Sequence, residues 1–133
     1  MILVDTSVWI DYFHGKESAH TSTLDNALIE GSVVMGDLIL LEILQGFKND
    51  SDYKTAKKSL GALGQIELLG IEMVPICADN YRKLRKSGKT IRKTTDVIIA
   101  SFCIRNRLPL LFQDRDFSPF VKQLGLVPAL PET

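Results

Sequence analysis

The amino-acid sequence predicts an α/β fold with a mostly parallel sheet. Apolar runs of three or four residues, the length of short buried strands, recur along the chain. Longer segments with the periodicity of helices separate these runs, as expected where helices connect parallel strands. A glycine, a proline or a capping residue lies at most of the boundaries between these segments. With 133 residues and no linker or internal repeat, the chain is expected to form a single domain over residues 1–133.

The first five elements follow from apolar runs and from the residues that end them. Three helices are expected to stop at Gly15, Gly31 and Gly46, because glycine adopts the left-handed conformation at a helix C-terminus without a steric penalty. Asp37 is predicted to cap the third of these helices. The predicted elements are a strand at Ile2–Val4, helices at Val8–Phe13 and Ser22–Ile29, a strand at Ser32–Met35 and a helix at Leu38–Gln45.

The remaining elements are marked by capping residues and prolines. Thr94 or Thr95 is predicted as the N-cap of a helix that is apolar nearly all round and is therefore expected to be buried. Ser118 followed by Pro119 combines a capping residue with proline at the first helical position. The predicted elements are a helix at Tyr53–Leu63, a strand at Glu72–Val74 closed by Pro75, helices at Asp79–Lys86 and from Asp96 to about Arg107, a strand at Leu110–Phe112, a helix at Ser118–Leu124 and a last short strand at Leu126–Val127.

The composition argues against several classes of protein. Lysine plus arginine and aspartate plus glutamate number 16 each, so nucleic acid meets no global attraction and would need a local basic patch. No apolar run approaches the roughly 20 residues of a membrane span. The start of the chain lacks the basic region of a signal peptide. Cys77 and Cys103 lie far apart without Cys/His clustering, which favours a reduced, cytoplasmic setting and argues against a zinc site.

Acidic residues follow two of the predicted strands. Asp5 comes directly after Ile2–Val4, and Asp114 and Asp116 come after Leu110–Phe112. Ligands of parallel sheets bind beyond the carboxyl ends of the strands, so these acids would meet if the two strands are neighbours. Each has an ordinary alternative: Asp5 can cap a helix, and the other two can form a polar turn.

Two further acids lie in apolar helices. Glu42 falls inside the most apolar stretch, Leu38–Leu44, where a lone buried carboxylate would cost several kcal/mol unless it is paired, protonated or bound to a metal. The alternative is a narrow polar stripe that leaves Glu42 in solvent. Asp96 is expected in the first turn of the buried helix, where the helix dipole favours its ionised form. As a helix-start residue it too has an ordinary explanation.

Taken together, the acids predict a divalent metal site. Carboxylates about 4 Å apart repel by about 4 kcal/mol at an effective dielectric constant near 20, and a divalent cation removes this repulsion. Oxygen ligands without cysteine or histidine favour Mg²⁺ or Mn²⁺. Such an ion suits phosphodiester hydrolysis. The run Arg82–Lys93 contains seven basic residues and no acid, and leads directly to Asp96. It is either a phosphate-binding segment, with Lys89, Arg92 and Lys93 beside the metal, or a solvated helix face and loop.

Four ordered motifs resemble the PIN-domain ribonucleases, and among them the VapC toxins of prokaryotic VapBC toxin–antitoxin pairs. The motifs are Met1–Asp11 (MILVDTSVWID), Leu41–Gly46 (LEILQG), Thr95–Ala100 (TDVIIA) and Asp114–Phe117 (DRDF), and the basic run Leu84–Arg92 is also similar. The resemblance implies a three-layer α/β/α fold with a short parallel sheet of strand order 3-2-1-4-5. It also implies an endoribonuclease that depends on Mg²⁺ or Mn²⁺.

Roles of individual residues follow from the resemblance by motif position. It implies a catalytic set of Asp5, Glu42, Asp96 and Asp114, of which Asp5, Asp96 and Asp114 hold the metal. Asp116 would be an accessory acid, and Thr6 or Ser7 would orient Asp5 or a metal-bound water. The resemblance further implies a homodimer, a VapB-type antitoxin that covers the site, and structured RNA, commonly tRNA, as substrate.

Other classes of protein remain as alternatives. An aspartyl-phosphate phosphatase would place a second acid two residues after Asp5, where this chain has Ser7. A receiver domain would need its acceptor aspartate after the central strand and a lysine near the last one. A non-catalytic module that binds RNA or a protein partner on the same fold is the main alternative to the nuclease.

Overall fold

The computed structural model describes residues 1–132 and contains a sheet of four parallel strands. The strands are β1 (Ile2–Val4), β2 (Val33–Gly36), β3 (Gly64–Ile66) and β4 (Leu110–Leu111), in the spatial order β3-β2-β1-β4. Leu3 of β1 pairs with Val34 on one side and with Leu110 on the other. The prediction that the first strand and the Leu110 strand are neighbours is therefore confirmed.

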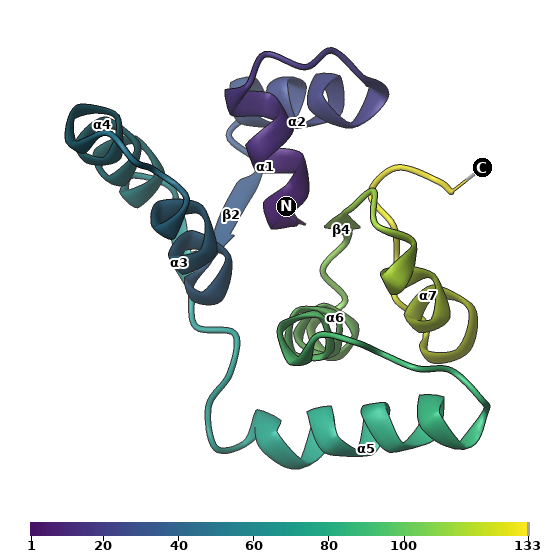
Figure 1. The fold of residues 1–133 in the computed structure, drawn as a ribbon. Coiled ribbons are helices and arrows are strands. Elements are labelled where there is room, and N and C mark those ends of the chain that lie inside the picture. Colours follow the sequence, from purple (N-terminus) through teal and green to yellow (C-terminus); the bar gives the residue numbers. More distant parts are fainter. Residues whose placement is uncertain (133) are drawn as a thin grey trace.

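Helices cover both faces of this sheet (Figure 1). The helix α1 packs against α2 and α3, and α3 packs against α4, while α5 packs against α6 and α7 on the other side. The three-layer α/β/α architecture is confirmed. The helices are α1 (Thr6–Phe13), α2 (Ala19–Glu30), α3 (Asp37–Gln45), α4 (Asp50–Gly61), α5 (Met73–Lys86), α6 (Thr94–Asn106) and α7 (Ser118–Leu124), with a 3₁₀ turn, η1, at Arg115–Phe117.

The third strand lies at Gly64–Ile66, and the predicted strand at Glu72–Val74 was wrong. β3 contains one apolar residue and is an edge strand with mostly exposed side chains, so no apolar run marks it. Glu72–Val74 instead leads into α5, where Met73 and Cys77 are four residues apart and both buried. Pro75 lies in the first turn of α5, where its missing N–H leaves no helical hydrogen bond unmade.

The predicted fifth strand at Leu126–Val127 is reduced to a single parallel bridge between Leu110 and Pro128. The Leu110 N–H donates to Val127 (2.9 Å), and the Ala129 N–H donates to Leu110 (2.9 Å). Both bonds come from the neighbours of Pro128, and the next donor in the ladder would be residue 131, which is a proline without an N–H, so the pairing stops there. The observed order 3-2-1-4 thus agrees with the prediction, and the fifth position holds an irregular segment.

The helix α6 lies in the centre of the fold, as its apolar sequence predicted. Val97, Ile99 and Ala100 are buried in it. It begins at Thr94 with Lys93 as N-cap and has no side-chain capping bond, so the predicted threonine cap was wrong. None of the helices in residues 1–132 combines the length and apolar character needed to cross a membrane.

Candidate active site

Five acidic side chains come from four segments next to the carboxyl ends of β1 and β4. Asp5 directly follows β1, and its N–H donates to Leu111 of β4 (2.9 Å). Asp5 occupies the N-cap position of α1, but its carboxylate makes no capping bond and so remains available to the site. The other four are Glu42 in α3, Asp96 in the first turn of α6, Asp114 after β4 and Asp116 in η1.

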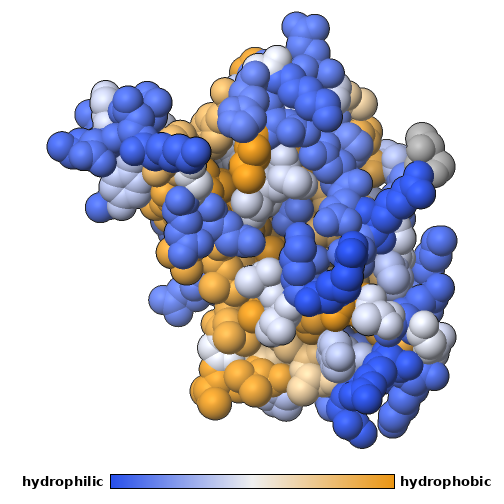
Figure 2. Space-filling view, in the orientation of Figure 1, coloured by the Kyte–Doolittle hydropathy of each residue, from blue (hydrophilic) through white to orange (hydrophobic). Residues whose placement is uncertain are grey.

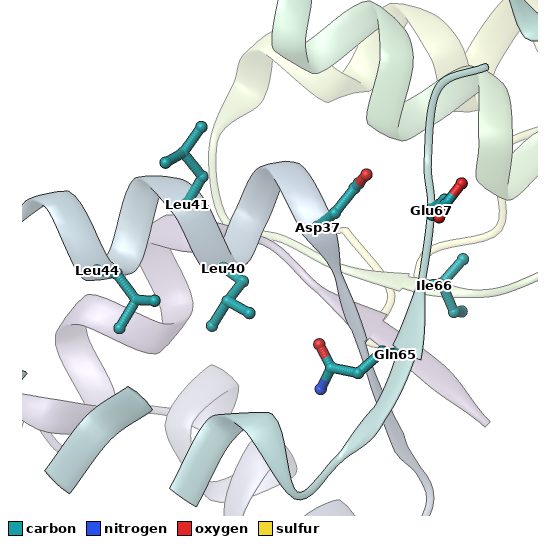
Figure 3. A pocket seen from close by; sticks show the side chains of 7 residues that line it. All are labelled: Asp37, Leu40, Leu41, Leu44, Gln65, Ile66 and Glu67. Carbon is teal, nitrogen blue, oxygen red and sulfur yellow. The ribbon is translucent and has the colours of Figure 1, made fainter. Parts of the chain in front are cut away.

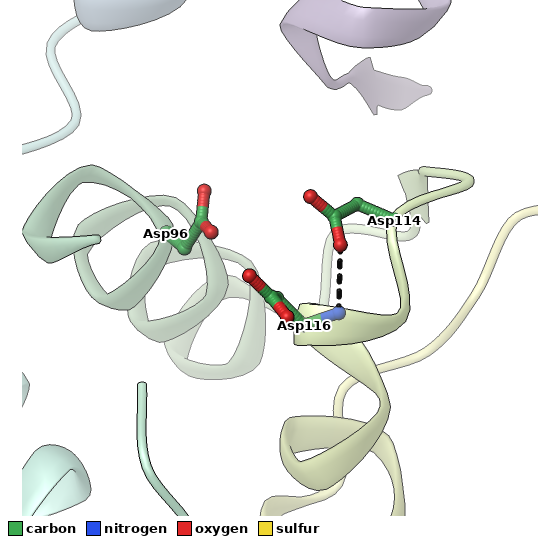
Figure 4. A group of neighbouring side chains, drawn as sticks. All are labelled: Asp96, Asp114 and Asp116. Atoms are coloured by element: carbon green, nitrogen blue, oxygen red, sulfur yellow. Dashed lines mark hydrogen bonds between the residues drawn. The ribbon is translucent and has the colours of Figure 1, made fainter. Parts of the chain in front are cut away.

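Asp96, Asp114 and Asp116 form the tightest group in the described chain. One carboxylate oxygen from each lies within 4.8 Å of the others. Their carboxylates converge from α6 and from the turn after β4 (Figure 4). Asp114 Oδ1 accepts the Asp116 N–H (2.9 Å), which fixes the turn and leaves its other oxygen, Oδ2, outside that bond. The sequence analysis predicted Asp5, Asp96 and Asp114 as the metal ligands, whereas this group contains Asp116 and not Asp5.

Asp96 shows why this group fits a divalent cation. Its side chain is 5% exposed, and Oδ2 is buried without any hydrogen-bond partner among residues 1–132. A buried carboxylate oxygen without a partner carries the full cost of desolvation. The pKa of Asp96 is raised to about 6, first by burial and then by the negative charge of Asp5, with Asp114 and Asp116 adding to it and Lys93 opposing it. Three carboxylates with one unsatisfied oxygen are a donor set that Mg²⁺ or Mn²⁺ would satisfy.

Asp5 is held beside this group by the two hydroxyl residues that follow it. Ser7 Oγ donates to Asp5 Oδ2 (3.1 Å), whereas Thr6 Oγ1 donates to Glu42 Oε1 (2.9 Å). Burial raises the pKa of Asp5 to about 6; the hydrogen bonds from Ser7 and the backbone lower it, and the charge of Glu42 raises it further. Ser7 thus positions Asp5, and Thr6 positions Glu42. Glu42 itself is half-buried and hydrogen-bonded, not a lone carboxylate in the core.

Two cations from the segment before α6 approach the acids. Arg92 Nη2 donates to both carboxylate oxygens of Asp116, at 3.1 Å each. Lys93 Nζ lies 3.9 Å from Asp114 Oδ2. Lys89 is exposed in the loop after α5 and makes no ion pair within residues 1–132. Of the three predicted RNA-binding residues, the structure therefore brings Arg92 and Lys93 to the acids, whereas Lys89 has no ion pair in the described part of the chain.

One contact at the site was missed by sequence reasoning. Gln113 Nε2 donates to Asp11 Oδ2 (2.8 Å), which also lies 3.5 Å from Lys16 Nζ. Gln113 directly precedes Asp114, so this bond ties the acidic turn to the end of α1. Asp11 ends the first quoted motif, but nothing in the sequence pairs it with a residue 102 positions away.

A separate hollow of about 370 Å³ lies between α3 and β3 (Figure 3). None of the predicted site residues lines it, and Leu40 and Leu44 give it an apolar wall. Asp37 Oδ1 at its rim accepts the N–H groups of Leu38 (2.8 Å) and Leu68 (3.0 Å), which is a structural role at the start of α3. The acidic group, not this hollow, is the candidate active site.

Comparison with known proteins agrees with this fold. Ribonuclease VapC11 of Mycobacterium tuberculosis is 29% identical over 128 residues, which are 95% of this chain and 96% of that protein. The structure of VapBC2 from Rickettsia felis bound to a DNA fragment from their promoter matches with a TM-score of 0.75 at 16% identity, over 96% of this chain and 97% of that chain. A toxin–antitoxin complex from Klebsiella pneumoniae matches with a TM-score of 0.70 at 18% identity, over 96% of each chain. The two structures show that the fold is shared. The PIN domain model matches residues 2–122, and the chain therefore belongs to the PIN domain family.

Proposed function

We propose that this protein is a metal-dependent endoribonuclease that hydrolyses phosphodiester bonds in structured RNA, with tRNA as the expected class. The observation that carries the proposal is the buried carboxylate of Asp96, which lies beside those of Asp114 and Asp116 and whose Oδ2 has no hydrogen-bond partner among residues 1–132. The relative VapC11 is named a ribonuclease, which supports the same activity.

The proposed metal ligands are Asp5, Asp96 and Asp114, as predicted from the sequence, together with Asp116. Asp116 belongs to the tight group, while Asp5 interacts with Asp96 through its charge. A bound Mg²⁺ or Mn²⁺ would supply acidification of a water molecule and stabilisation of charge on the phosphate.

The remaining residues act directly on water and RNA. Glu42, held by the Thr6 hydroxyl at 2.9 Å, is the proposed acceptor of the proton from the attacking water. Arg92, Lys93 and the exposed Lys89 are proposed to bind the phosphate backbone, because cations that touch phosphates orient RNA without reading its sequence.

The test is cleavage of total cellular RNA by purified protein in Mg²⁺ or Mn²⁺, with and without chelator. Asp96→Asn should abolish discrete cleavage, because it removes the charge of the central ligand. Asp79→Asn is the matched control, since Asp79 is exposed on α5 and has no partner within residues 1–132. Cleavage that persists in chelator or in Asp96→Asn would refute the proposal. Folded protein that binds RNA but never cuts would favour a non-catalytic module.

The proposed protein partners are a VapB-type antitoxin and a second copy of this chain, in the cytoplasm. Two of the matching solved structures, those from Rickettsia felis and Klebsiella pneumoniae, are toxin–antitoxin complexes, which supports the first. An exposed apolar area at the start of α5 supports the second: Leu69, Ile71 and Val74 are 39, 85 and 46% exposed. The apolar surface is visible where α5 begins (Figure 2).

The homodimer is tested with Ile71→Asp. A carboxylate in a desolvated contact leaves a buried charge without a partner, so the dimer should dissociate to monomers. Sedimentation at micromolar concentration measures this directly. Ile29→Asp is the control, since Ile29 is 77% exposed on α2, away from this surface. A wild-type protein that is already monomeric without antitoxin would contradict the proposed homodimer.

A further inference from the structure

We propose that Arg92 is a phosphate ligand that is released by the metal: it pairs with Asp116 when the acidic group holds no cation and transfers to an RNA phosphate when the group is filled. This inference rests on the proposed function. It adds a coupling between metal and RNA binding, and assigns that coupling to one side chain.

The geometry shows that Arg92 and a cation compete for the same atoms. Arg92 Nη2 contacts both Oδ1 and Oδ2 of Asp116, at 3.1 Å each. Asp116 is also one of the three carboxylates that converge within 4.8 Å. A cation bound to this group would draw on the lone pairs and the negative charge that now hold the guanidinium. Filling the group therefore weakens the ion pair.

Exposure shows that the exchange needs little rearrangement. The Arg92 side chain is 73% exposed, whereas that of Asp116 is 20% exposed. The guanidinium thus lies on the solvent side of the pair, in the non-helical segment before α6. Exposed ion pairs contribute little to stability, so losing this pair does not endanger the fold. The planar guanidinium is also well suited to binding phosphate through two hydrogen bonds.

The neighbouring cations are not held in the same way. Lys93 Nζ is 3.9 Å from Asp114, too far for a hydrogen bond, and Lys89 has no ion pair within the described chain. Both can attract phosphate whether or not a metal is present. Arg92 differs because a carboxylate of the proposed metal site already occupies its donors. Coupling between the two ligands should therefore depend on Arg92, and by linkage RNA should tighten metal binding by the same factor.

The first measurement is the binding of labelled bulk tRNA to the protein by fluorescence anisotropy, with and without Ca²⁺. The second is the binding of Mn²⁺ to the protein without RNA, by calorimetry. Ca²⁺ replaces Mg²⁺ to limit cleavage, and a gel confirms that the tRNA stays intact. In wild type, Ca²⁺ should tighten tRNA binding by about 5-fold or more, within the usual range of coupling between sites. Arg92→Gln should reduce this to less than about 2-fold and should bind Mn²⁺ more tightly than wild type, because a competitor has been removed.

Three further variants separate this mechanism from general electrostatics. Asp116→Asn frees Arg92 without metal, so it should tighten tRNA binding in chelator. That gain should disappear in the double variant Arg92→Gln/Asp116→Asn, whereas a loss of general repulsion would persist there. Arg105→Gln is the matched control, since Arg105 is an exposed arginine at the far end of α6, and it should leave the coupling unchanged.

The outcomes distinguish the two proposals. Equal Ca²⁺ coupling in wild type and Arg92→Gln, or a gain in Asp116→Asn that persists in the double variant, would overturn the transfer of Arg92 while leaving the nuclease intact. If Mn²⁺ fails to bind wild type, the metal site itself is refuted and the transfer with it.

Discussion

Replacing Asp96 with asparagine should stabilise the metal-free protein. In wild type, this carboxylate is buried, has an oxygen without a hydrogen-bond partner among residues 1–132, and lies close to the charges of Asp5, Asp114 and Asp116. Asparagine has nearly the same shape and no charge. The Asp96→Asn variant should therefore keep the packing of α6 and lose the electrostatic cost, at the same time as it loses the proposed metal ligand.

The magnitude follows from the pKa of Asp96, which is raised from 3.8 to about 6. A difference of this size between the unfolded and the folded state costs about 3 kcal/mol of stability at neutral pH. The buried amide of asparagine also lacks a partner, and its desolvation offsets about 1–2 kcal/mol of the gain from removing the charge. The expected net gain is about 1–2 kcal/mol, or roughly 3–8 °C in Tm for a domain of this size.

The pH dependence identifies the cause of the gain. A carboxyl group whose folded pKa is raised destabilises the folded state above that pKa, and the penalty disappears as the pH falls to the unfolded value. The advantage of Asp96→Asn should therefore be complete above about pH 6 and fall to about zero near pH 5. Near pH 4 it should become a disadvantage of about 1–2 kcal/mol, because only the cost of the buried amide remains there. Asp5, whose pKa is also about 6, is present in both proteins, so its contribution largely cancels.

The assay is thermal unfolding in chelator at pH 4, 5, 6 and 7.5, monitored by circular dichroism. Adding Mn²⁺ at pH 7.5 should raise the Tm of wild type and not that of Asp96→Asn, because a ligand that binds only the folded state stabilises it. Asp79→Asn, at the exposed position on α5, should behave as wild type. The reasoning fails if Asp96→Asn is less stable than wild type in chelator at pH 7.5, or if its advantage is the same at pH 4.

Two further predictions test packing and positioning. Gly36→Ala places a Cβ 2.5 Å from Cδ1 of the fully buried Leu68 and should cost about 1–3 kcal/mol in urea unfolding. Gly61→Ala is the control and should cost nothing, because a Cβ there meets no atom within 4 Å beyond its chain neighbours and the backbone of its own helix; equal effects would contradict this reading of the core. Thr6→Val removes the hydroxyl that donates to Glu42 and should lower kcat for RNA cleavage by about 10-fold or more without weakening Mn²⁺ binding; an unchanged kcat would show that the orientation of Glu42 is unimportant.

The sequence was informative wherever one segment carried its own signal. The apolar run of β1 and the all-round apolar character of α6 identified the two central elements, and the positions of the acids after the strands followed from them. β3 escaped prediction because an exposed edge strand needs no apolar run, and Glu72–Val74 misled because a short apolar run fits a strand or a helix equally well. The catalytic and metal-binding roles of the acids stay predictions that biochemistry has to test.

The contacts within the site depended on segments that are far apart in the chain. The packing of η1 against α6 brings Asp116 together with Asp96 and Asp114 in the tight group. Asp5 lies beside this group. The bond between Arg92 and Asp116 spans 24 residues and that between Gln113 and Asp11 spans 102. Local propensity determines where helices and strands begin, but it carries no information about which side chains meet across them. Those partners are set by the packing of the layers, because only in the folded chain do the ends of β1, β4 and α6 come together.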